Sequence, residues 1–385
     1  MAIGAGDEYW KEQALPSVFK HTLLDKYMPQ FTGMTGSAAR GRRVVYLDGY
    51  AGRGRYEDGT RASVERILTI AQNQHRNAGL DWTCFFVEQD DESAVALVQV
   101  IAEYAAVRVT VFAHHGAVLE VLDDVIAAAA GVPLFLFLDP CGLGVPYHQL
   151  TELLSTERSQ TWPPTEILLN FSLEAVRRIG GHVMSPKGNE TTMARLDATV
   201  GGRWWRQRFA AGVTNKAVTA VVQEFCTRLG ADTGMTVTSV PVRRAPTHKP
   251  IYHLVFGTRS PYGLWVFGDS TARATQAWWD SCEEVEADTD PNALFTVAAT
   301  MRPSLDTIEE VAVGRITENL AALLAQHGDF KVVDHTIAVF GEHYGQVRDL
   351  VVRKAVQELH KQGRTASDGR GGRPRELRVI RPASP

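Results

Sequence analysis

The sequence has 385 residues, more than one ordinary hydrophobic core accommodates, and this length predicts two or three domains. Its 44% hydrophobic and 22% charged residues are typical of a soluble globular protein, and a net charge of only −4 requires any nucleic-acid surface to be local. The four cysteines are isolated, without a CxxC pair, so we expect neither a metal site nor a disulfide framework. No segment approaches the roughly 18 apolar residues of a membrane span, and the acidic N-terminal stretch is unlike a signal peptide. We therefore expect a cytoplasmic protein with no membrane contact.

Five short apolar runs occur between residues 44 and 171, at 44–48, 83–88, 107–113, 133–139 and 166–171. Segments with three- and four-residue apolar spacing lie between them, for example 92–105 and 117–130, and predict helices. Most of the runs are continuously apolar, which indicates burial on both faces, as in a parallel sheet covered by helices. The pattern predicts an α/β, Rossmann-like, mostly parallel sheet. A later pair of runs, 236–244 and 251–258, predicts antiparallel strands at its C-terminal edge, after a polar and aromatic insertion at 178–225.

The last part of the chain has a different pattern. Helical patterns at 307–328, 336–344 and 346–363 are followed by a glycine-rich basic stretch, 364–382. Three helices and a basic hairpin are typical of a winged helix, so we predict a main domain at 1–300 and a winged-helix domain at 301–385. We expect Arg370, Arg373 and Arg375 in this wing to contact nucleic-acid phosphates. Winged helices also dock proteins, which is the alternative interpretation of the tail.

A glycine-rich loop, "LDGYAGRGRYEDGT" at 47–60, follows the first predicted strand. Asp48 ends the strand, and Gly52 and Gly54 open the turn into the next helix. Such a turn lets a ligand lie against bare backbone at a helix N-terminus, although a spaced-glycine loop can equally be a simple tight turn. The loop lacks the three-glycine fingerprint of nicotinamide enzymes. Its acid and small Ala51-Gly52 step suit a ligand with an ammonium group and no pyrophosphate.

Two more acidic residues end neighbouring strands. Glu88 ends the second strand, where an acid accepts hydrogen bonds from ribose hydroxyls in doubly wound folds. Asp139 follows the fourth strand at the edge where such sheets bind ligands. Together these features predict a class I S-adenosyl-L-methionine site. We expect the loop and the strand ends to form this site. At most one of the adjacent His114 and His115, which follow the third predicted strand, should face the adenine. The predicted cofactor residues are Asp48, Gly49, Tyr50, Ala51, Gly52, Gly54, Glu88, His115 and Gly116.

An ordered set of motifs, including "FKHTLLDKYMPQF", "YLDGYAGRGRYEDGT", "FFVEQD", "FLDPCGLGVP", "ILLNFSLEAVRR" and "HKPIYHLVFGT", resembles the three-Cys-motif partner family. The resemblance runs from about residue 19 to 267, two-thirds of the chain. It implies a methyltransferase-like fold with S-adenosylmethionine as cofactor. It also implies a possible partner, the adjacently encoded cysteine-motif protein that gives the family its name. The family usually has tyrosine where this chain has Cys141.

The segment Asp139-Pro140-Cys141-Gly142 is similar to the D-P-P-Y-like tetrapeptide of amino methyltransferases that act on nucleic acids. There the acid and a backbone carbonyl accept hydrogen bonds from an exocyclic amine and align it for methyl transfer. Gly142 cannot stack on a base, so Phe171 or Tyr147 would supply the aromatic ring.

Two further points stay open. Cytosine-C5 methyltransferases carry a Pro-Cys nucleophile, and Pro140-Cys141 allows that alternative mechanism. Arg177 and Arg178 follow the fifth strand and either meet a phosphate or carboxylate near the pocket or are simply solvated.

The sequence thus predicts an S-adenosylmethionine-dependent methyltransferase that acts on a nitrogen of a nucleic-acid base, with Asp139 aligning the acceptor. Two alternatives remain: a methyltransferase acting on a small molecule or peptide, and a non-catalytic factor that binds nucleic acid or protein through its winged helix.

Overall fold

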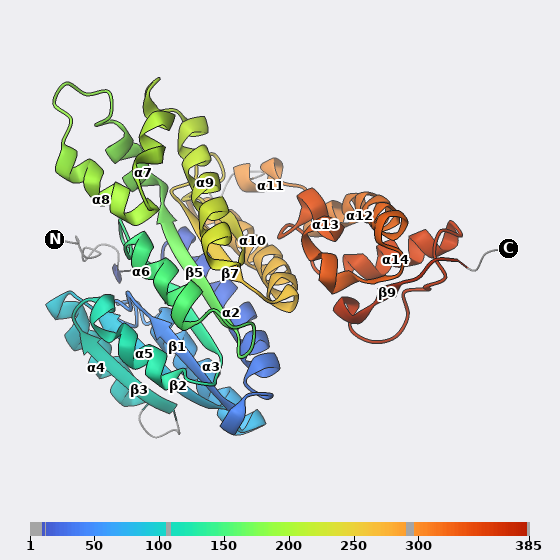
Figure 1. The fold of residues 1–385 in the computed structure, drawn as a ribbon, viewed down its shortest axis with the longest axis horizontal. Coiled ribbons are helices and arrows are strands. Elements are labelled where there is room, and N and C mark those ends of the chain that lie inside the picture. The colour runs from blue at the N-terminus through green and yellow to red at the C-terminus, as the bar shows by residue number, and fades with distance from the viewer. Residues whose placement is uncertain (1–9, 12, 105–108, 290–295, 383–385) are drawn as a thin grey trace. The chain divides into compact units, whose positions relative to one another are not determined.

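The structure is a computed structural model that describes residues 10–11, 13–104, 109–289 and 296–382 (Figure 1). Its helices and strands alternate along the first half of the chain, whereas the second half is mainly helical. The helices are α2 (Leu15–Thr35), α3 (Ser63–Ala78), α4 (Asp91–Glu103), α5 (Leu122–Ala128), α6 (Tyr147–Glu152), α7 (Leu173–Gly180), α8 (Glu190–Val200), α9 (Asn215–Thr233), α10 (Pro261–Thr289), α11 (Val297–Met301), α12 (Leu305–His327), α13 (Thr336–Phe340) and α14 (Val351–Lys361). The strands are β1 (Arg43–Asp48), β2 (Asp81–Glu88), β3 (Val109–His115), β4 (Leu134–Leu138), β5 (Thr165–Ser172), β6 (Thr236–Val242), β7 (Tyr252–Thr258), β8 (Phe330–Lys331) and β9 (Arg378–Val379).

A seven-stranded sheet forms the centre of the first part of the chain, in the order β3-β2-β1-β4-β5-β7-β6. Strands β1 to β5 run parallel to one another, and β7 runs antiparallel to both β5 and β6. This is a Rossmann-like sheet of the class I methyltransferase type, so the predicted fold class is confirmed. The predicted third strand at 107–113 is observed at Val109–His115; residues 107 and 108 lie outside the described residues.

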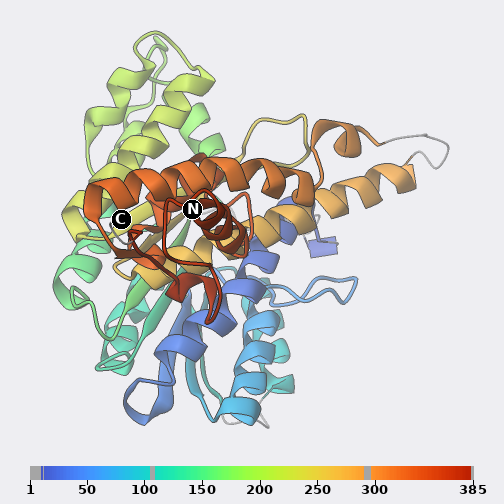
Figure 2. The same cartoon turned by 90° about the vertical axis from the view of Figure 1, so that its right-hand side faces the viewer.

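Helices cover both faces of this sheet (Figures 1 and 2). On one face, Leu47, Leu136 and Leu169 belong to a core that α5, α6, α7, α8 and α9 share. On the other face, Phe135 packs against Phe31 of α2, with ring centroids 5.5 Å apart. The continuously apolar runs are therefore buried on two sides in β1, β4 and β5. The third run is different, because β3 is an edge strand with partly exposed residues.

The insertion predicted at 178–225 is helical and belongs to the same hydrophobic core. It contains α8, the short 3₁₀ segment Arg203–Phe209 and the first half of α9. Trp205 and Phe209 are fully buried, and the Trp205 indole donates to Asp197 at 2.8 Å. Of the adjacent Trp204 and Trp205, the second is thus a core residue, and the insertion is an extension of the core.

The chain divides into two compact units, one formed by residues 1–17 and 28–259 and the other by residues 18–27 and 260–385. This division differs from the predicted boundary near residue 300. The reason is α10, whose Trp265 is buried in the same core as Ile316 of α12 and Val352 of α14. The Trp265 indole also donates to Asp349 at 3.0 Å. Helix α10, residues 261–289, therefore belongs with the tail.

The three helices predicted in the tail are observed as α12, α13 and α14. The two ends of the basic stretch after α14 are joined by hydrogen bonds, from Ala366 N to Ile380 O at 2.9 Å and from Ile380 N to Ser367 Oγ at 3.1 Å. Its short strand β9 pairs antiparallel with β8, which follows α12. Arg353 of α14 donates to the carbonyls of Gly369, Gly371 and Gly372 and so fixes the glycine-rich loop.

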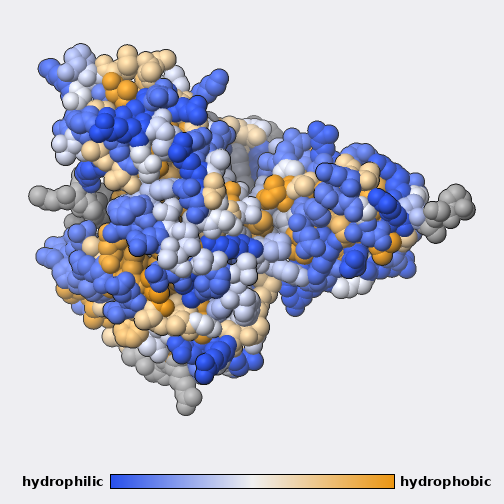
Figure 3. Space-filling view, viewed as in Figure 1, coloured by the Kyte–Doolittle hydropathy of each residue, from blue (hydrophilic) through white to orange (hydrophobic). Residues whose placement is uncertain are grey.

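On the face shown in Figure 3, hydrophilic side chains predominate and hydrophobic ones form small patches. Within the described residues, no helix combines the length and apolarity needed to cross a bilayer.

Truncation at residue 300, the domain boundary that the sequence predicts, tests whether α10 belongs with the tail. A chain that ends at residue 300 loses the core partners of Trp265, which is 1% exposed in the full chain. We expect it to bind an apolar dye such as anilinonaphthalene sulfonate and to show red-shifted tryptophan emission. The same truncation with Trp265→Gln is the matched control and should bind less dye. Dye binding no higher than that of the full chain would contradict this assignment of α10.

Candidate functional site

The carboxyl edge of the sheet brings the ends of β1, β2, β4 and β5 together. Asp48 at the end of β1 lies between Phe86 of β2 and Phe137 of β4 in the strand register. Backbone hydrogen bonds continue past the strands, from Gly49 N to Phe137 O and from Ala51 N to Val87 O. Because neighbouring strands are about 4.8 Å apart, acids at the tips of β2 and β4 lie on either side of the β1 loop, about 10 Å apart. The sequence-predicted site residues of the sheet are therefore brought to one edge.

Asp48 organises the glycine loop. Its side chain is fully buried; one oxygen accepts from Tyr50 N at 3.2 Å and the other from the Ser63 hydroxyl at 2.8 Å. A position near a ligand ammonium stays a prediction for Asp48. The two observed hydrogen bonds have a simple cause: a strand-end carboxylate directly below a turn is the nearest acceptor for the turn's own donors.

Glu88 connects the second strand to the same loop. Its Oε2 accepts from Gly52 N at 2.7 Å, and its Oε1 accepts from Asp90 N at 2.8 Å. The side chain is half-buried, and a carboxylate has about four lone-pair positions, so it retains capacity for further donors such as hydroxyls. Glu88 thus both holds the loop backbone and faces the edge at which a ligand would lie.

The glycines of the loop are required by space and by conformation. Gly52 and Gly54 have φ of +63° and +81°, in the left-handed region that disfavours other residues. A Cβ at Gly49 would overlap Leu138 and Val118.

Trp10 is a residue that the sequence reasoning missed. Its ring lies where a Cβ of Gly52 would be, and it forms a small buried cluster with Tyr56 and Ala62. Its carbonyl accepts from Glu57 N at 2.8 Å. A tryptophan in a polar N-terminal stretch was the available signal, but nothing in the sequence connects it with a loop 40 residues later.

The predicted adenine-facing residues lie at the tip of β3. Gly116 N donates to Glu88 O at 3.0 Å, which places this turn beside Glu88. His115 is exposed and lies 3.0 Å from Asp91 at the start of α4, while His114 Nε2 lies 2.8 Å from Glu120. Both histidines therefore have acidic neighbours of their own, and in the strand register His115 lies opposite Glu88.

Asp139 is paired with Asn170, the second residue missed from the sequence. Asn170 Nδ2 donates to Asp139 Oδ1 at 2.8 Å, and the Asn170 Oδ1 atom is buried without a partner among the described residues. Pro140 is buried, whereas Cys141 is exposed. Gly49 N donates to Phe137 O at 2.9 Å, so the β1 loop begins beside the end of β4. Burial, followed by the charge at Cys141, raises the pKa of Tyr50 to about 12.

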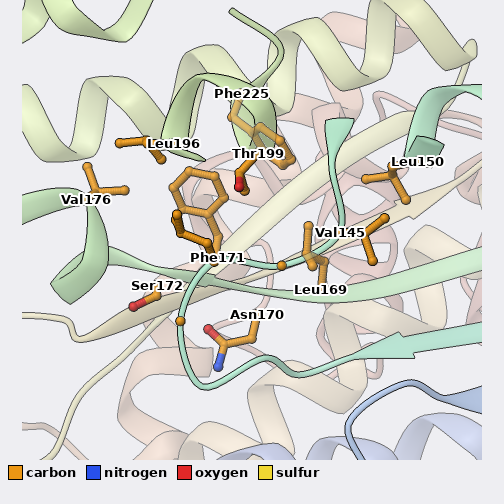
Figure 4. Close-up of a pocket in the computed structure, with 13 residues that line it drawn as sticks. Val145, Leu150, Leu169, Asn170, Phe171, Ser172, Val176, Leu196, Thr199 and Phe225 are labelled. Atoms are coloured by element: carbon orange, nitrogen blue, oxygen red, sulfur yellow. The ribbon is translucent and has the colours of Figure 1, made fainter. Parts of the chain in front are cut away.

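An apolar pocket lies beside this pair (Figure 4). Gly142, Leu143 and Gly144 of the β4 loop form part of it, and Asn170 and Phe171 of β5 form another part. Leu196, Thr199 and Phe225 from the helical extension also line it. The Phe171 and Phe225 ring centroids are 4.8 Å apart.

Gly142 stands where the D-P-P-Y-like tetrapeptide has an aromatic residue, and Phe171 and Tyr147 are the two residues predicted to supply that ring instead. They differ in position. Phe171 lines the pocket, whereas Tyr147 lies in the core and its hydroxyl donates to Asp232 at 2.7 Å.

The three arginines predicted to contact nucleic acid from the tail have different environments. Arg370 and Arg373 are exposed. Arg375 is 9% exposed, and its guanidinium lies 6.0 Å from the centre of the Tyr262 ring. The prediction for Arg375 is therefore corrected: its side chain packs inside the second unit and is not available to a phosphate.

Arg177 of α7 is half-buried and donates to Pro250 O at 2.9 Å. Burial lowers its pKa, as it does for the neighbouring His253 of β7. The pKa of His253 is lowered to about 4, first by burial and then by the charges of Arg243 and Arg177. His253 Nδ1 lies 3.0 Å from the Ser239 hydroxyl. This histidine is therefore neutral at physiological pH.

The described residues contain no group of three or more histidine, cysteine or acidic side chains that could hold a metal ion.

Comparison with known proteins gives no family. No protein-family model matches the sequence, and no curated protein matches it. Solved structures similar to the chain include the methyltransferase domain of bacterial CtHen1-CN, with 9% identity over 56% of this chain and 89% of that chain and a TM-score of 0.28. PKMT2 from Rickettsia typhi shows 9% identity over 89% of this chain and 70% of that chain, with a TM-score of 0.32. EvdMO1 shows 13% identity over 71% of this chain and 52% of that chain, with a TM-score of 0.28. Because these scores are below 0.5, the fold is assigned from the strand order and not from these similarities.

The contact between Trp10 and the glycine loop predicts a coupled stability effect. Gly52→Ala should lower the free energy of unfolding by at least about 1 kcal/mol, because alanine disfavours the positive φ and its methyl group overlaps the indole. In a Trp10→Ala background the overlap is removed, so the same change should cost less. Urea denaturation of the four proteins measures the difference. Equal costs in both backgrounds would contradict the contact.

The depressed pKa of His253 predicts a pH dependence of stability. The unfolded chain protonates this histidine near its ordinary pKa of 6.5, whereas the folded chain does so near 4. Between these values the unfolded state binds more protons, so the contribution is fully present above about pH 6.5 and is lost as the pH falls toward 4. His253→Gln should remove roughly 1–3 kcal/mol of this pH-dependent loss in denaturant titrations at pH 7 and 4.5. Parallel pH profiles of the two proteins would contradict the assignment.

Proposed function

We propose that this protein is an S-adenosylmethionine-dependent methyltransferase that methylates a nitrogen of a nucleic-acid base, with Asp139 aligning the acceptor. The observation that carries this proposal is the Asp139–Asn170 pair, which lies at the carboxyl edge next to an apolar pocket and beside the glycine loop. Hydrogen-bond acceptors next to an apolar slot are what an exocyclic amine on a flat aromatic ring needs.

The residues at the edge fit the cofactor. Gly52 and Gly54 give the loop its tight turn at positive φ, and Glu88 has lone pairs left for ribose hydroxyls. The turn at Gly116 borders Glu88, which is where the adenine would follow. When bound, S-adenosylmethionine supplies an electrophilic methyl group. The chain's contribution is to hold the nucleoside through Glu88 and the loop, while Asp48 keeps the loop in shape.

On the acceptor side, Asp139 and the Asn170 carbonyl would accept hydrogen bonds from the amine. Such hydrogen bonds fix the direction of the nitrogen lone pair, and alignment is the main source of rate enhancement in a transfer of this kind. The amine proton released on transfer passes to Asp139 or to solvent. The pocket beside Phe171 has a volume of about 20 Å³, room for roughly one water, so a base would enter only once the pocket opens. Phe171 would then replace the aromatic residue missing at Gly142.

Membership of the three-Cys-motif partner family, a cysteine-motif partner and a winged-helix assignment for the tail are part of the proposal. The family and its partner are supported by the sequence motifs. The winged helix is supported by the order α12, α13, α14 and by the pairing of β8 with β9.

The cofactor site is tested by calorimetry with S-adenosylmethionine and S-adenosylhomocysteine. Glu88→Ala should weaken binding at least tenfold, because it removes the ribose acceptor and releases Gly52 N. Glu152→Ala, on the exposed surface of α6, is the matched control and should bind normally. Unchanged affinity of the Glu88 variant would refute the placement of the cofactor.

The acceptor residues are tested by S-adenosylhomocysteine release with DNA and RNA oligonucleotides. Asp139→Ala should reduce turnover by about 100-fold or more and leave cofactor affinity within a factor of about two. Cys141→Ser distinguishes the mechanisms, since loss of turnover would favour a thiol nucleophile and normal turnover would exclude it. If the wild-type protein releases no S-adenosylhomocysteine with any nucleic acid but does so with a peptide or a small molecule, the base assignment is wrong. If nothing accepts a methyl group, the protein is a binding factor.

A further inference from the structure

A strongly basic cleft lies at the same edge of the sheet, between α7 and the loop at 243–251 that joins β6 to β7. We call it the α7 cleft. Four permanent cations line it, Arg177, Arg178, Arg244 and Lys249, together with His248 and a single acid, Glu174. The chain as a whole has a net charge of −4, so this excess of positive charge is local. Clefts lined by one sign of charge concentrate ligands of the opposite sign.

Most of this charge is not neutralised by the protein itself. Glu174 pairs with Arg244 at 3.1 Å, and both side chains are more than half exposed, so the pair contributes little. Arg178 and Lys249 are exposed and make no ion pair with the residues that the structure describes. Arg177 uses one guanidinium nitrogen for Pro250 O, while its Nε is buried without a partner in the described part of the chain. The cleft therefore presents several unused N–H donors.

The cleft is also held in a fixed shape. Leu173 N and Glu174 N both donate to Ile251 O, and Ile251 N donates to Val242 O. With the contact from Arg177 to Pro250, these hydrogen bonds attach the β6–β7 loop to the first turns of α7. Charged groups on anchored backbone lose less freedom on binding than charges on a mobile tail.

The position of the cleft connects it to the acceptor pocket. Asn170 and Phe171 line that pocket, Ser172 caps α7, and Arg177 follows on the same helix. Tyr252, the first residue of β7, pairs with Ser172, so the basic loop at 243–251 ends at the tip of β5. Arg177 lies five residues beyond Ser172, about 8 Å along the helix, which is the rise of two or three nucleotides at about 3.4 Å each. A strand that places one base in the pocket would have its adjoining phosphates within reach of this cleft.

We infer that the α7 cleft binds the backbone phosphates of the nucleic-acid strand whose base is methylated. The inference rests on the proposed function and adds the surface that holds the substrate. It places the principal phosphate contacts on the catalytic unit, at Arg177, Arg178, Arg244 and Lys249, and not on the arginines of the tail.

The experiment compares three sets of variants by fluorescence anisotropy with labelled single-stranded and duplex DNA and RNA from 50 to 200 mM salt. The cleft variant is Arg177→Gln/Arg244→Gln/Lys249→Gln. The matched control removes two exposed cations elsewhere on the same unit, Arg195→Gln/Lys216→Gln, and the tail variant is Arg370→Gln/Arg373→Gln.

We expect the cleft variant to lose at least tenfold in affinity for the single strand at 50 mM salt. Its slope of log affinity against log salt should fall by about 2, as for three lost contacts at about 0.7 each. The control should match the wild type, and the tail variant should lose less than the cleft variant. Absence of strand binding by the wild type at 50 mM salt, or an unchanged slope in the cleft variant, would overturn the inference.

Two further measurements keep the test decisive. Arg178→Gln/Lys249→Gln changes only exposed side chains, so it tests the cleft even if the Arg177 variant folds poorly; it should lose about threefold or more in affinity, and wild-type affinity would count against the inference. Adenosine monophosphate and inorganic phosphate serve as competitors. If the mononucleotide binds as tightly as the strand and with the same dependence on the cleft cations, the cleft is a nucleotide site and the strand assignment is wrong.

The outcome separates this inference from the proposed function. Loss of strand binding in the cleft variant, without S-adenosylhomocysteine release by the wild type, would support the cleft and refute base methylation. Methyl transfer to an oligonucleotide, with normal strand binding by the cleft variant, would support the enzyme and refute the cleft.

Discussion

The parallel register of β1 with β2 and β4 is the constraint on which every other feature of the site depends. Parallel strands end at a common edge, so Asp48, Glu88 and Asp139, which are 40 to 91 residues apart in the sequence, become neighbours. Backbone hydrogen bonds then extend beyond the strands, from Gly49 to Phe137 and from Gly116 to Glu88. A shift in register would separate the loop from its acids. The chemistry of the edge is thus a consequence of strand pairing, and the buried apolar runs are what secure that pairing.

The strands were predictable because their signal is local and strong. Continuous apolar runs such as 133–139 permit few structures other than a buried strand, and the acids that follow them mark the edge directly. The domain division was less predictable. Residues 261–289 form one helix, and whether that helix belongs to the sheet or to the tail depends on where Trp265 is buried. Burial is a property of contacts distant in sequence. The same limit applies to Arg375. It lies in a stretch rich in arginine and glycine, and nothing in the sequence indicates that its side chain packs against Tyr262.

The site residues divide in a similar way. Sequence patterns identify residue types suited to a ligand, but they do not show which of them serve the fold. Asp48 is an example: it was identified because an acid at a strand end suits an ammonium, yet its oxygens are used by Tyr50 and Ser63. Asn170 is the reverse case. It lies within an apolar strand and has no motif of its own, and only the pairing of β4 with β5 places it 2.8 Å from Asp139.

Charge distribution leads to a functional argument that composition alone does not allow. The tail contains more arginines in sequence, but the fold uses several of them internally: Arg353 holds loop carbonyls, Arg364 pairs with Glu318, and Arg375 is buried. The cations of α7 and the β6–β7 loop are fewer, and most of them are left unpaired by the described residues beside the pocket. An anion is attracted by the charge that remains after the fold has satisfied its own requirements. By that criterion, the acceptor pair and the phosphate contacts that we propose lie at the same edge of the sheet.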